Sequence, residues 1–365
     1  MIVVVKIGTS SVTRPDGGVD EGAVLKLGTE LAELLSSGHK AVVVTSGAVT
    51  AGVAVLAAGG DTRRPTDPVA LQALSAIGQH RLMRVYDDAL GRVGLIAGQV
   101  LLAPTDFAHR ARYLHARDTL RRLIDLGIVP IVNENDAIAD DEIRFGDNDR
   151  LAALVAHLLQ ADLLVLLTDT AGLFSADPRV DEAATLIEEV VEIGHELELA
   201  AGGPGSDNAR GGMASKLAAA KMASWSGVRT VIAAAERPSV LVDSVRGAGT
   251  VGTVFLAHRR VLNARKLWIA FALRPCGRLV VDDGARRALL ERGTSLLPSG
   301  VLEVSGRFSP KDAVEIAGSD GIVFAKGIVR APSARAGEWM GRRTAELPPD
   351  VPPEIVHRDD LVVLV

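Results

Sequence analysis

The densest set of polar side chains in this sequence follows an apolar run that ends at Val132. Asn133–Asp136 come directly after that run, and a second polar set follows at Gly146–Asp149. Open α/β sheets bind ligands where their strands end and loops begin. A cluster of carboxylates and amides is also too costly to bury for packing alone. The two sets therefore predict a pocket for a small zwitterion.

Two lysines lie next to glycines in a pattern that suits phosphate. Lys6 ends the apolar run Ile2–Lys6, and Gly8 follows with two hydroxyl residues after it. Gly211–Lys216 opens a predicted helix, so that helix N–H groups and the Lys216 ammonium point at one place, as in an anion site. For Lys6 taken alone, an exposed lysine before a turn is an equally good interpretation.

Two further strand ends carry residues with two possible roles. Ser46 either caps the next helix or helps its N–H groups hold a carboxylate. The segment Thr168–Arg179 is either a turn in which Asp side chains hydrogen-bond to the nearby backbone, or a loop that contacts a nucleotide.

Other familiar motifs are absent or unconvincing. The P-loop pattern does not occur, and Gly247–Gly252 matches G-x-G-x-x-G but precedes a predicted strand, which indicates a turn. The histidines show neither metal-ligand spacing nor a nucleophile–base arrangement, so no metal site is predicted. Two lysines, two glycine turns and one acid–amide pocket together indicate phosphoryl transfer. A carboxylate acceptor is already ionised at neutral pH, so a general base is unnecessary.

The composition is that of a globular protein in a reducing compartment. The chain has 365 residues, 48% of them hydrophobic, and Cys276 is its single cysteine. No apolar stretch approaches the roughly 18 residues of a membrane span, and no leader peptide is apparent. We therefore expect a cytoplasmic protein.

The charge distribution argues against a nucleic-acid binder. Residues 1–256 carry 23 Lys and Arg against 32 Asp and Glu, whereas residues 257–274 carry 5 basic and no acidic residues. The remainder is nearly neutral, and phosphate backbones normally require a surplus of lysine and arginine.

The predicted elements divide the chain into two domains. Strands expected at Ile2–Lys6, Ala41–Thr45, Gly127–Val132, Leu163–Thr168 and Arg229–Ala233 alternate with helical periodicity, which predicts a mostly parallel sheet sandwiched by helices. After about residue 256 the pattern changes to short strand-like runs with one short helix. We expect an α/β catalytic domain over 1–256, a basic linker over 257–274 and a small β-rich domain over 275–365.

These segments, in this order, resemble the amino acid kinase family, and within it the members that phosphorylate L-glutamate. The tail, including Asp283–Ala285 and Ser295–Gly300, resembles a PUA domain. The resemblance rests on Val3–Ser10, Thr45–Val49, Gly78-Gln79, Tyr113–Leu120, Val129–Ile138, Phe145–Ala152, Thr168–Arg179 and Gly211–Leu217.

The resemblance implies ATP-dependent phosphorylation of the glutamate side-chain carboxylate, the first step toward proline. By position, it assigns glutamate binding to Ser46, Asp136 and Asn148, with Asp149 ordering that pocket. It places Lys6 and Lys216 on either side of the transferring phosphoryl group, with Asp169 orienting them as the third catalytic residue. The ATP-binding residues that it implies are Lys6, Gly8, Thr168, Asp169, Arg210, Gly211, Gly212, Met213, Ala214, Ser215 and Lys216.

The resemblance also implies cofactors and partners. Mg²⁺ is expected on the ATP phosphates and water, together with proline as a feedback inhibitor and a homodimer or homotetramer. Lability of an acyl phosphate product suggests a handover to glutamate-5-semialdehyde dehydrogenase. The chain departs from the family at Thr9, where serine is common, before Asp312, where a glycine is usual, and at Ala331-Pro332. The tail departures and the neutral charge argue against RNA binding.

Overall fold

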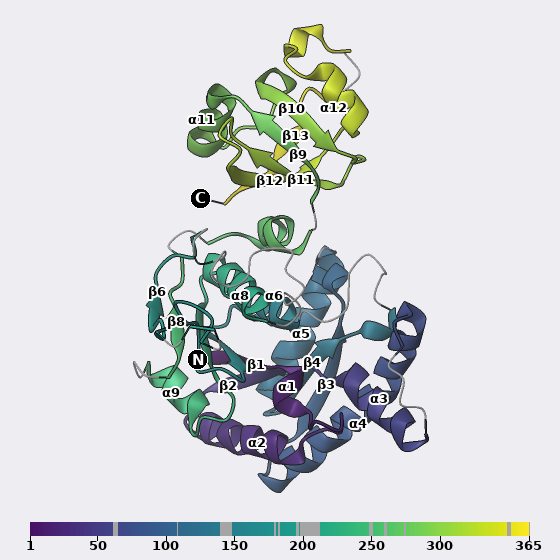
Figure 1. Cartoon of the computed structure of the whole chain (residues 1–365), viewed down its shortest axis with the longest axis vertical. Coiled ribbons are helices and arrows are strands. Elements are labelled where there is room, and N and C mark those ends of the chain that lie inside the picture. Colours follow the sequence, from purple (N-terminus) through teal and green to yellow (C-terminus); the bar gives the residue numbers. More distant parts are fainter. Residues whose placement is uncertain are drawn as a thin grey trace. The chain divides into compact units, whose positions relative to one another are not determined.

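The chain folds into two compact units, Met1–Val261 and Leu262–Val365 (Figure 1). The computed structural model describes residues 1–60, 65–107, 109–138, 148–178, 180–181, 183–194, 197, 212–247, 251–258, 261–273, 275–348 and 352–364. No described helix combines the length and hydropathy that crossing a membrane requires.

An eight-stranded sheet in the order β3-β4-β2-β1-β5-β7-β8-β6 forms the centre of the first unit. The strands from β3 to β7 are mutually parallel, and β8 pairs antiparallel with β7. The five strands predicted by range and the strand predicted after Gly252 are all confirmed, whereas the two edge strands, β3 and β6, were not predicted. The strands are β1 (Ile2–Ile7), β2 (Lys40–Val44), β3 (Ala97–Leu102), β4 (Val129–Glu134), β5 (Leu163–Thr168), β6 (Glu189–Val190), β7 (Arg229–Ala234) and β8 (Thr253–Phe255).

Helices cover both faces of this sheet. Figure 1 shows α5, α6 and α8 over one face and α2, α4 and α9 over the other. Strands buried on both faces explain the continuous apolar runs in β1 and β5. The helices are α1 (Thr9–Val12), α2 (Glu21–Ser36), α3 (Ala48–Ala58), α4 (Pro68–Arg92), α5 (Arg110–Asp125), α6 (Asn148–Leu159), α8 (Met213–Trp225) and α9 (Val240–Arg246), with 3-10 turns at Pro104–Phe107 and Asp136–Ile138.

The sequence of α2 shows why it forms and which face it buries. Asp20 caps its first turn by accepting a hydrogen bond from the backbone N–H of Ala23 at 3.0 Å. Val24, Leu27 and Leu31 recur at helical spacing and are buried in the core. The helix therefore packs its apolar stripe on the sheet.

Helices α3 and α4 touch backbone to backbone at two glycines. A Cβ atom built on Gly78 would lie 1.8 Å from the carbonyl oxygen of Ala48, and one on Gly52 would lie 2.0 Å from that of Leu74. Only glycine permits an approach this close. The contact fixes α4 against the start of α3, beside the end of β2.

The second unit is built on a five-stranded sheet in the order β10-β9-β11-β12-β13. The pair β9–β11 is parallel and the other pairs are antiparallel, over a core that includes Val314, Ile316 and Phe324. The β-rich domain is confirmed. Its strands are β9 (Pro275–Val281), β10 (Val301–Gly306), β11 (Ala313–Ala317), β12 (Val323–Val329) and β13 (Val356–Val363), and its helical segments are α10 (Ala264–Leu267), a π-helix at Trp268–Ala272, α11 (Asp283–Arg292), α12 (Ser333–Trp339) and 3-10 turns at Pro298–Gly300 and Thr344–Glu346.

Part of the expected linker is held by the second sheet. The buried ammonium of Lys326 donates to the carbonyl oxygen of Ala270 at 3.2 Å and to that of Leu273, which satisfies backbone groups at the end of the π-helix. These contacts explain why the segment from Leu262 onward belongs to the second compact unit. The domain boundaries at 256/257 and 274/275 remain predictions.

Gly78→Ala is expected to destabilise the first unit by about 3 kcal/mol or more, because the added methyl group overlaps a backbone carbonyl that cannot move aside. Gly91→Ala, in the same helix with nothing within 4 Å of the added Cβ, provides the control and should stabilise the protein by about 0.5–1 kcal/mol. Chemical denaturation measures both. Equal effects of the two substitutions would contradict the close α3–α4 contact.

Candidate active site

The polar residues singled out in the sequence meet at one edge of the first sheet. Strands β1, β2, β4 and β5 are parallel neighbours, so their carboxyl ends lie on the same side. Lys6 lies near the end of β1, Ser46 follows β2, Asp136 follows β4, and Thr168 ends β5. Helix α6 begins at the same edge with Asn148 and Asp149.

A buried aspartate lies between the two lysines. Asp149 Oδ1 is 2.6 Å from Lys6 Nζ, and its Oδ2 is 3.5 Å from Lys216 Nζ. The Ser215 hydroxyl donates to Oδ2 at 2.5 Å. Lys6, Asp149 and Lys216 are each at most 5% exposed as whole residues. One carboxylate therefore carries the counter-charge for two buried ammonium groups.

The surroundings of Asp149 favour its charged form. Burial by itself raises the pKa of this carboxyl, but the charges of Lys6 and Lys216 and hydrogen bonds from Lys6 and Ser215 lower it below its usual range. Asp149 therefore remains a carboxylate beside the two lysines at neutral pH.

A network of side-chain amides lies beside this cluster. Asn148 Nδ2 has three acceptors within 2.9 Å: the carbonyl oxygen of Thr45, Asn133 Oδ1 and the Ser46 hydroxyl oxygen. Asn133 Nδ2 in turn donates to Gln79 Oε1 at 2.6 Å. Among the described residues, Asn148 Oδ1 and Gln79 Nε2 are buried without a hydrogen-bond partner. Each such atom costs about 1–3 kcal/mol, which indicates a function other than stability.

Helix α4 holds the other side of this network through polar side chains on one helical face. The Ser75 hydroxyl donates to Asp136 Oδ2 at 2.7 Å, Gln79 contacts Asn133, and the Tyr86 hydroxyl lies 2.8 Å from Thr45 Oγ1. Ser75, Gln79 and Tyr86 are buried. None of the three was identified from the sequence as a site residue. The signal was present, since polar residues spaced by four and seven positions interrupt the buried stripe of an amphipathic helix.

The carboxyl of Asp136 forms no ion pair with any residue in the part of the chain that the structure describes; its partner is the Ser75 hydroxyl. Burial raises its pKa above the usual range, and the hydrogen bond from Ser75 offsets only part of that effect. A buried acid held in this way is suited to a ligand that brings its own positive charge.

The start of α8 supplies backbone donors next to Lys216. Gly212 is the N-cap residue and has no side chain to satisfy the first N–H groups, which belong to Met213, Ala214 and Ser215. A Cβ atom on Gly8 would lie 3.5 Å from Lys6 Nζ, at an ordinary van der Waals distance. Glycine at both positions keeps side chains away from the backbone N–H groups, which suits an anion.

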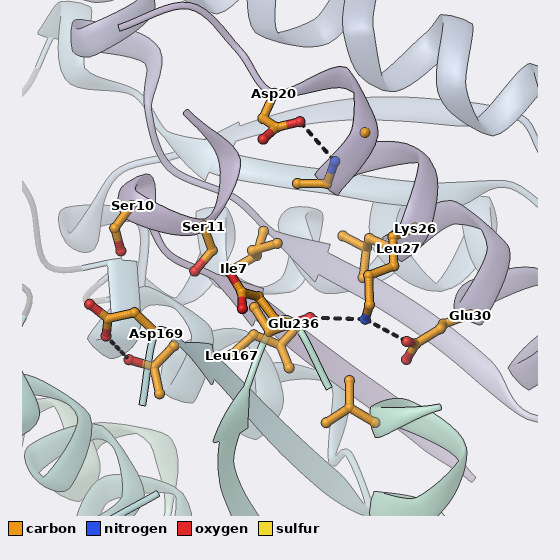
Figure 2. Close-up of a pocket in the computed structure, with 15 residues that line it drawn as sticks. Ile7, Ser10, Ser11, Asp20, Lys26, Leu27, Glu30, Leu167, Asp169 and Glu236 are labelled. Carbon is orange, nitrogen blue, oxygen red and sulfur yellow. Dashed lines mark hydrogen bonds and ion pairs between the residues drawn. The ribbon is translucent and has the colours of Figure 1, made fainter. Parts of the chain in front are cut away.

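A cavity of about 300 Å³ adjoins the ends of β1 and β5 (Figure 2). Asp169 lines it and accepts a hydrogen bond from Thr168 Oγ1 at 3.0 Å. Figure 2 also shows Lys26 beside Glu30; its Nζ donates to Glu30 Oε1 at 2.6 Å and to the carbonyl oxygen of Ala235 at 2.9 Å. The Lys26–Glu30 pair therefore fixes the backbone that follows β7, and it was not identified from the sequence.

Some predicted residues lie outside the described residues, namely Phe145, Gly146, Asp147, Arg210 and Gly211. Most of the others are joined in small sets. Lys6, Asp149, Ser215 and Lys216 are joined by direct contacts, as are Ser46 and Asn148 in the neighbouring network. Asp169 is hydrogen-bonded to Thr168, and Asp149 is the carboxylate that contacts both lysines. Among the described residues, no group of three or more His, Cys, Asp and Glu could hold a metal ion.

Residues 1–234 match the model of the amino acid kinase family. The chain belongs to the amino acid kinase family. Residues 277–348 of this amino acid kinase match the PUA domain model. These matches confirm the family resemblance that the sequence motifs indicated.

Curated relatives match this amino acid kinase along nearly its whole length. It is 44% identical to a glutamate 5-kinase of Geobacter sulfurreducens and 45% identical to one of Geobacter metallireducens, in both cases over 99% of this chain and 97% of the relative. A glutamate 5-kinase of Cupriavidus pinatubonensis is 43% identical with the same coverage. The fold is also that of an isopentenyl phosphate kinase, with a TM-score of 0.51 and 18% identity over 70% of this chain and 100% of that one.

Asp149→Asn is expected to lower the free energy of unfolding at neutral pH by about 3–5 kcal/mol, because two buried ammonium groups lose their counter-charge. The native pKa of Asp149 is lowered, so its contribution is present above the unfolded-state pKa of about 3.9 and is lost as the pH falls through the native pKa. Urea denaturation across a pH series should show that the difference in unfolding free energy between the natural protein and the variant decreases in acid. Asp87→Asn, at an exposed position, is the control. A difference in unfolding free energy that does not depend on pH would contradict the ion cluster.

Asp136→Asn is expected to raise the free energy of unfolding at neutral pH, which is the opposite of the effect of Asp149→Asn. The native pKa of Asp136 is raised, so its ionisation weakens the fold as the pH rises through that value. The variant lacks the charge and still offers an oxygen to Ser75, so it should be more stable than the natural protein at neutral pH. The advantage should vanish below the unfolded-state pKa of about 3.9. The same denaturation series measures it, and a less stable variant at neutral pH would be inconsistent with a desolvated carboxylate.

Proposed function

We propose that this amino acid kinase transfers the γ-phosphoryl group of ATP to the side-chain carboxylate of L-glutamate, as the first step of proline biosynthesis. The observation that carries the proposal is the buried Lys6–Asp149–Lys216 cluster, which adjoins a pocket of amides and a buried acid. The curated relatives named glutamate 5-kinase support the same activity.

The nucleotide side of the proposed site lies at the glycine turns. Lys6 and Gly8 on β1 and its following turn, with Gly212, Met213, Ala214, Ser215 and Lys216 at the start of α8, would hold the phosphates. Thr168 and Asp169 would contact the rest of the nucleotide, and Arg210 and Gly211 belong to the same proposed set. The absence of a side chain at Gly8, next to the Lys6 ammonium, supports this assignment.

The glutamate side is the amide network. Ser46 and Asn148 would contact the substrate, and Asp136 would accept its ammonium group, which matches a buried carboxyl whose neighbour is a neutral hydroxyl. Asp149 would order the pocket and hold the two lysines apart. Asp169, whose oxygen is engaged by Thr168, would act at the nucleotide.

The reaction requires positioning and charge neutralisation. One carboxylate oxygen of glutamate attacks the γ-phosphorus, the new P–O bond forms, and the bond from the γ-phosphorus to the bridging oxygen of ADP breaks. The acceptor is ionised at neutral pH, since its pKa is about 4.3, so no proton has to be removed. Lys6 and Lys216 would neutralise charge that spreads over the phosphoryl oxygens and the leaving group.

Mg²⁺ fits this site only as a companion of the nucleotide. Among the described residues there is no carboxylate cluster for a metal ion, and Mg²⁺ commonly uses one carboxylate together with phosphates and water. Asp169, one of the proposed ATP residues, is an exposed carboxylate and is the residue that would hold the ion. When bound, the ion would neutralise phosphate charge.

Further parts of the proposal rest on the family. We propose a cytoplasmic homodimer or homotetramer, inhibited by proline that competes for the glutamate pocket. Its acyl phosphate product is labile, which favours transfer to glutamate-5-semialdehyde dehydrogenase. The nearly neutral PUA domain argues for regulation or assembly and not for RNA binding.

Hydroxylamine trapping tests the activity directly. With Mg-ATP, the purified protein should form hydroxamate with L-glutamate and not with N-acetylglutamate or aspartate, and added proline should suppress it. Hydroxamate with another acceptor alone would contradict the proposed substrate. No product with any acceptor would contradict the proposed reaction.

Lys216→Ala is expected to lower kcat by about 10²–10³-fold with a smaller change in the KM for glutamate, because the lost charge acts mainly in the transition state. The exposed Lys40→Ala is the matched control. Turnover by Lys216→Ala close to that of the control would contradict the assigned role.

A further inference from the structure

The direction of the amide network is fixed by the backbone at two points. The backbone N–H of Glu134 can only donate, and it contacts Asn133 Oδ1 at 2.9 Å. The carbonyl oxygen of Thr45 can only accept, and Asn148 Nδ2 lies 2.6 Å from it. These two groups determine which end of each carboxamide carries the oxygen and which the nitrogen.

With those ends fixed, Asn133 must direct its Nδ2 toward α4. Gln79 Oε1 accepts there at 2.6 Å, and the side chain of Gln79 is only 8% exposed. Without that acceptor, the Asn133 Nδ2 would be a buried donor with no partner, and rotation of the carboxamide would place it against the Glu134 N–H. Gln79 Oε1 therefore stabilises the orientation of Asn133 that the Glu134 N–H sets, because it satisfies the buried Nδ2.

The orientation of Asn133 in turn determines that of Asn148, a proposed substrate-binding residue. Asn133 Oδ1 accepts from Asn148 Nδ2 at 2.8 Å, and that nitrogen also contacts the Ser46 hydroxyl at 2.9 Å. If Asn133 rotated, two N–H groups would face each other and Asn148 would have to move. The helix that carries Gln79 cannot shift to compensate, because Gly78, its chain neighbour, contacts the backbone of α3.

We propose that Gln79 is a positioning residue for the amino acid substrate, acting through Asn133 on Asn148 and Ser46. This inference rests on the proposed function, because the ligand that it orients is glutamate. It adds a specific role for α4, whose buried carboxamide holds Asn133 in the orientation that the backbone sets.

The test is Gln79→Met, which keeps the length and unbranched shape of the side chain and removes its amide. We expect the KM for glutamate in the hydroxamate assay to rise about 10-fold, the effect of losing one hydrogen bond of about 1.4 kcal/mol, while the KM for ATP stays within twofold. Gln99→Met, at an exposed position of β3, is the matched control and should change neither KM.

A double-mutant cycle distinguishes positioning from a general loss of stability. If Gln79 acts through Asn133, Gln79→Met should raise the KM for glutamate in the natural background but add less than twofold in an Asn133→Ala background. Additive effects, or equal rises in both KM values, would overturn the proposal. Should Gln79→Met not fold, Gln79→Asn, which withdraws the carboxamide by one methylene, carries the same measurements. Failure of the natural protein to phosphorylate glutamate would instead refute the proposed function.

Discussion

The arrangement of the active site depends on one buried carboxylate that is shared by two lysines. Lys6 comes from the central strand and Lys216 from the first turn of α8, so they are far apart in the sequence and reach the same point from different elements. Without Asp149, two ammonium groups buried this closely would repel each other. The carboxylate offsets part of the cost of burying the two ammonium groups. The remaining positive charge is what a nucleotide phosphate would meet.

The fold that holds this cluster follows from simple features of the sequence. Apolar runs such as that of β5 required a strand covered on both faces, and parallel strands brought their polar ends to one edge. The meeting of Lys6, Ser46, Asp136 and Thr168 at that edge could therefore be predicted from the order of strands and polar segments alone. Their pairing could not, because the sequence does not specify which carboxylate faces which ammonium.

The contribution of α4 was harder to predict for a physical reason. Ser75, Gln79 and Tyr86 are far in sequence from the residues that they contact, and polar residues within a long helix are usually on its solvent side. All three are buried, and the position of α4 depends on its tight glycine contact with α3, which involves both helices at once. Likewise, β3 has a short, partly exposed sequence with weak alternation, so its pairing at the sheet edge became apparent only with β4 beside it.

Asn148 and Asp149 are consecutive residues at the first turn of α6, and they serve different halves of the site. Asn148 contacts the side-chain amide of Asn133 in the proposed substrate pocket, and Asp149 contacts the lysines of the proposed phosphoryl pocket. Adjacent Cα atoms are about 3.8 Å apart, so a single peptide unit sets the spacing between the two halves. The start of this helix therefore fixes the distance between the two halves of the site. An acceptor that is shorter by one methylene leaves its oxygen about 1 Å from the productive position, an error that can cost about 10²-fold in rate.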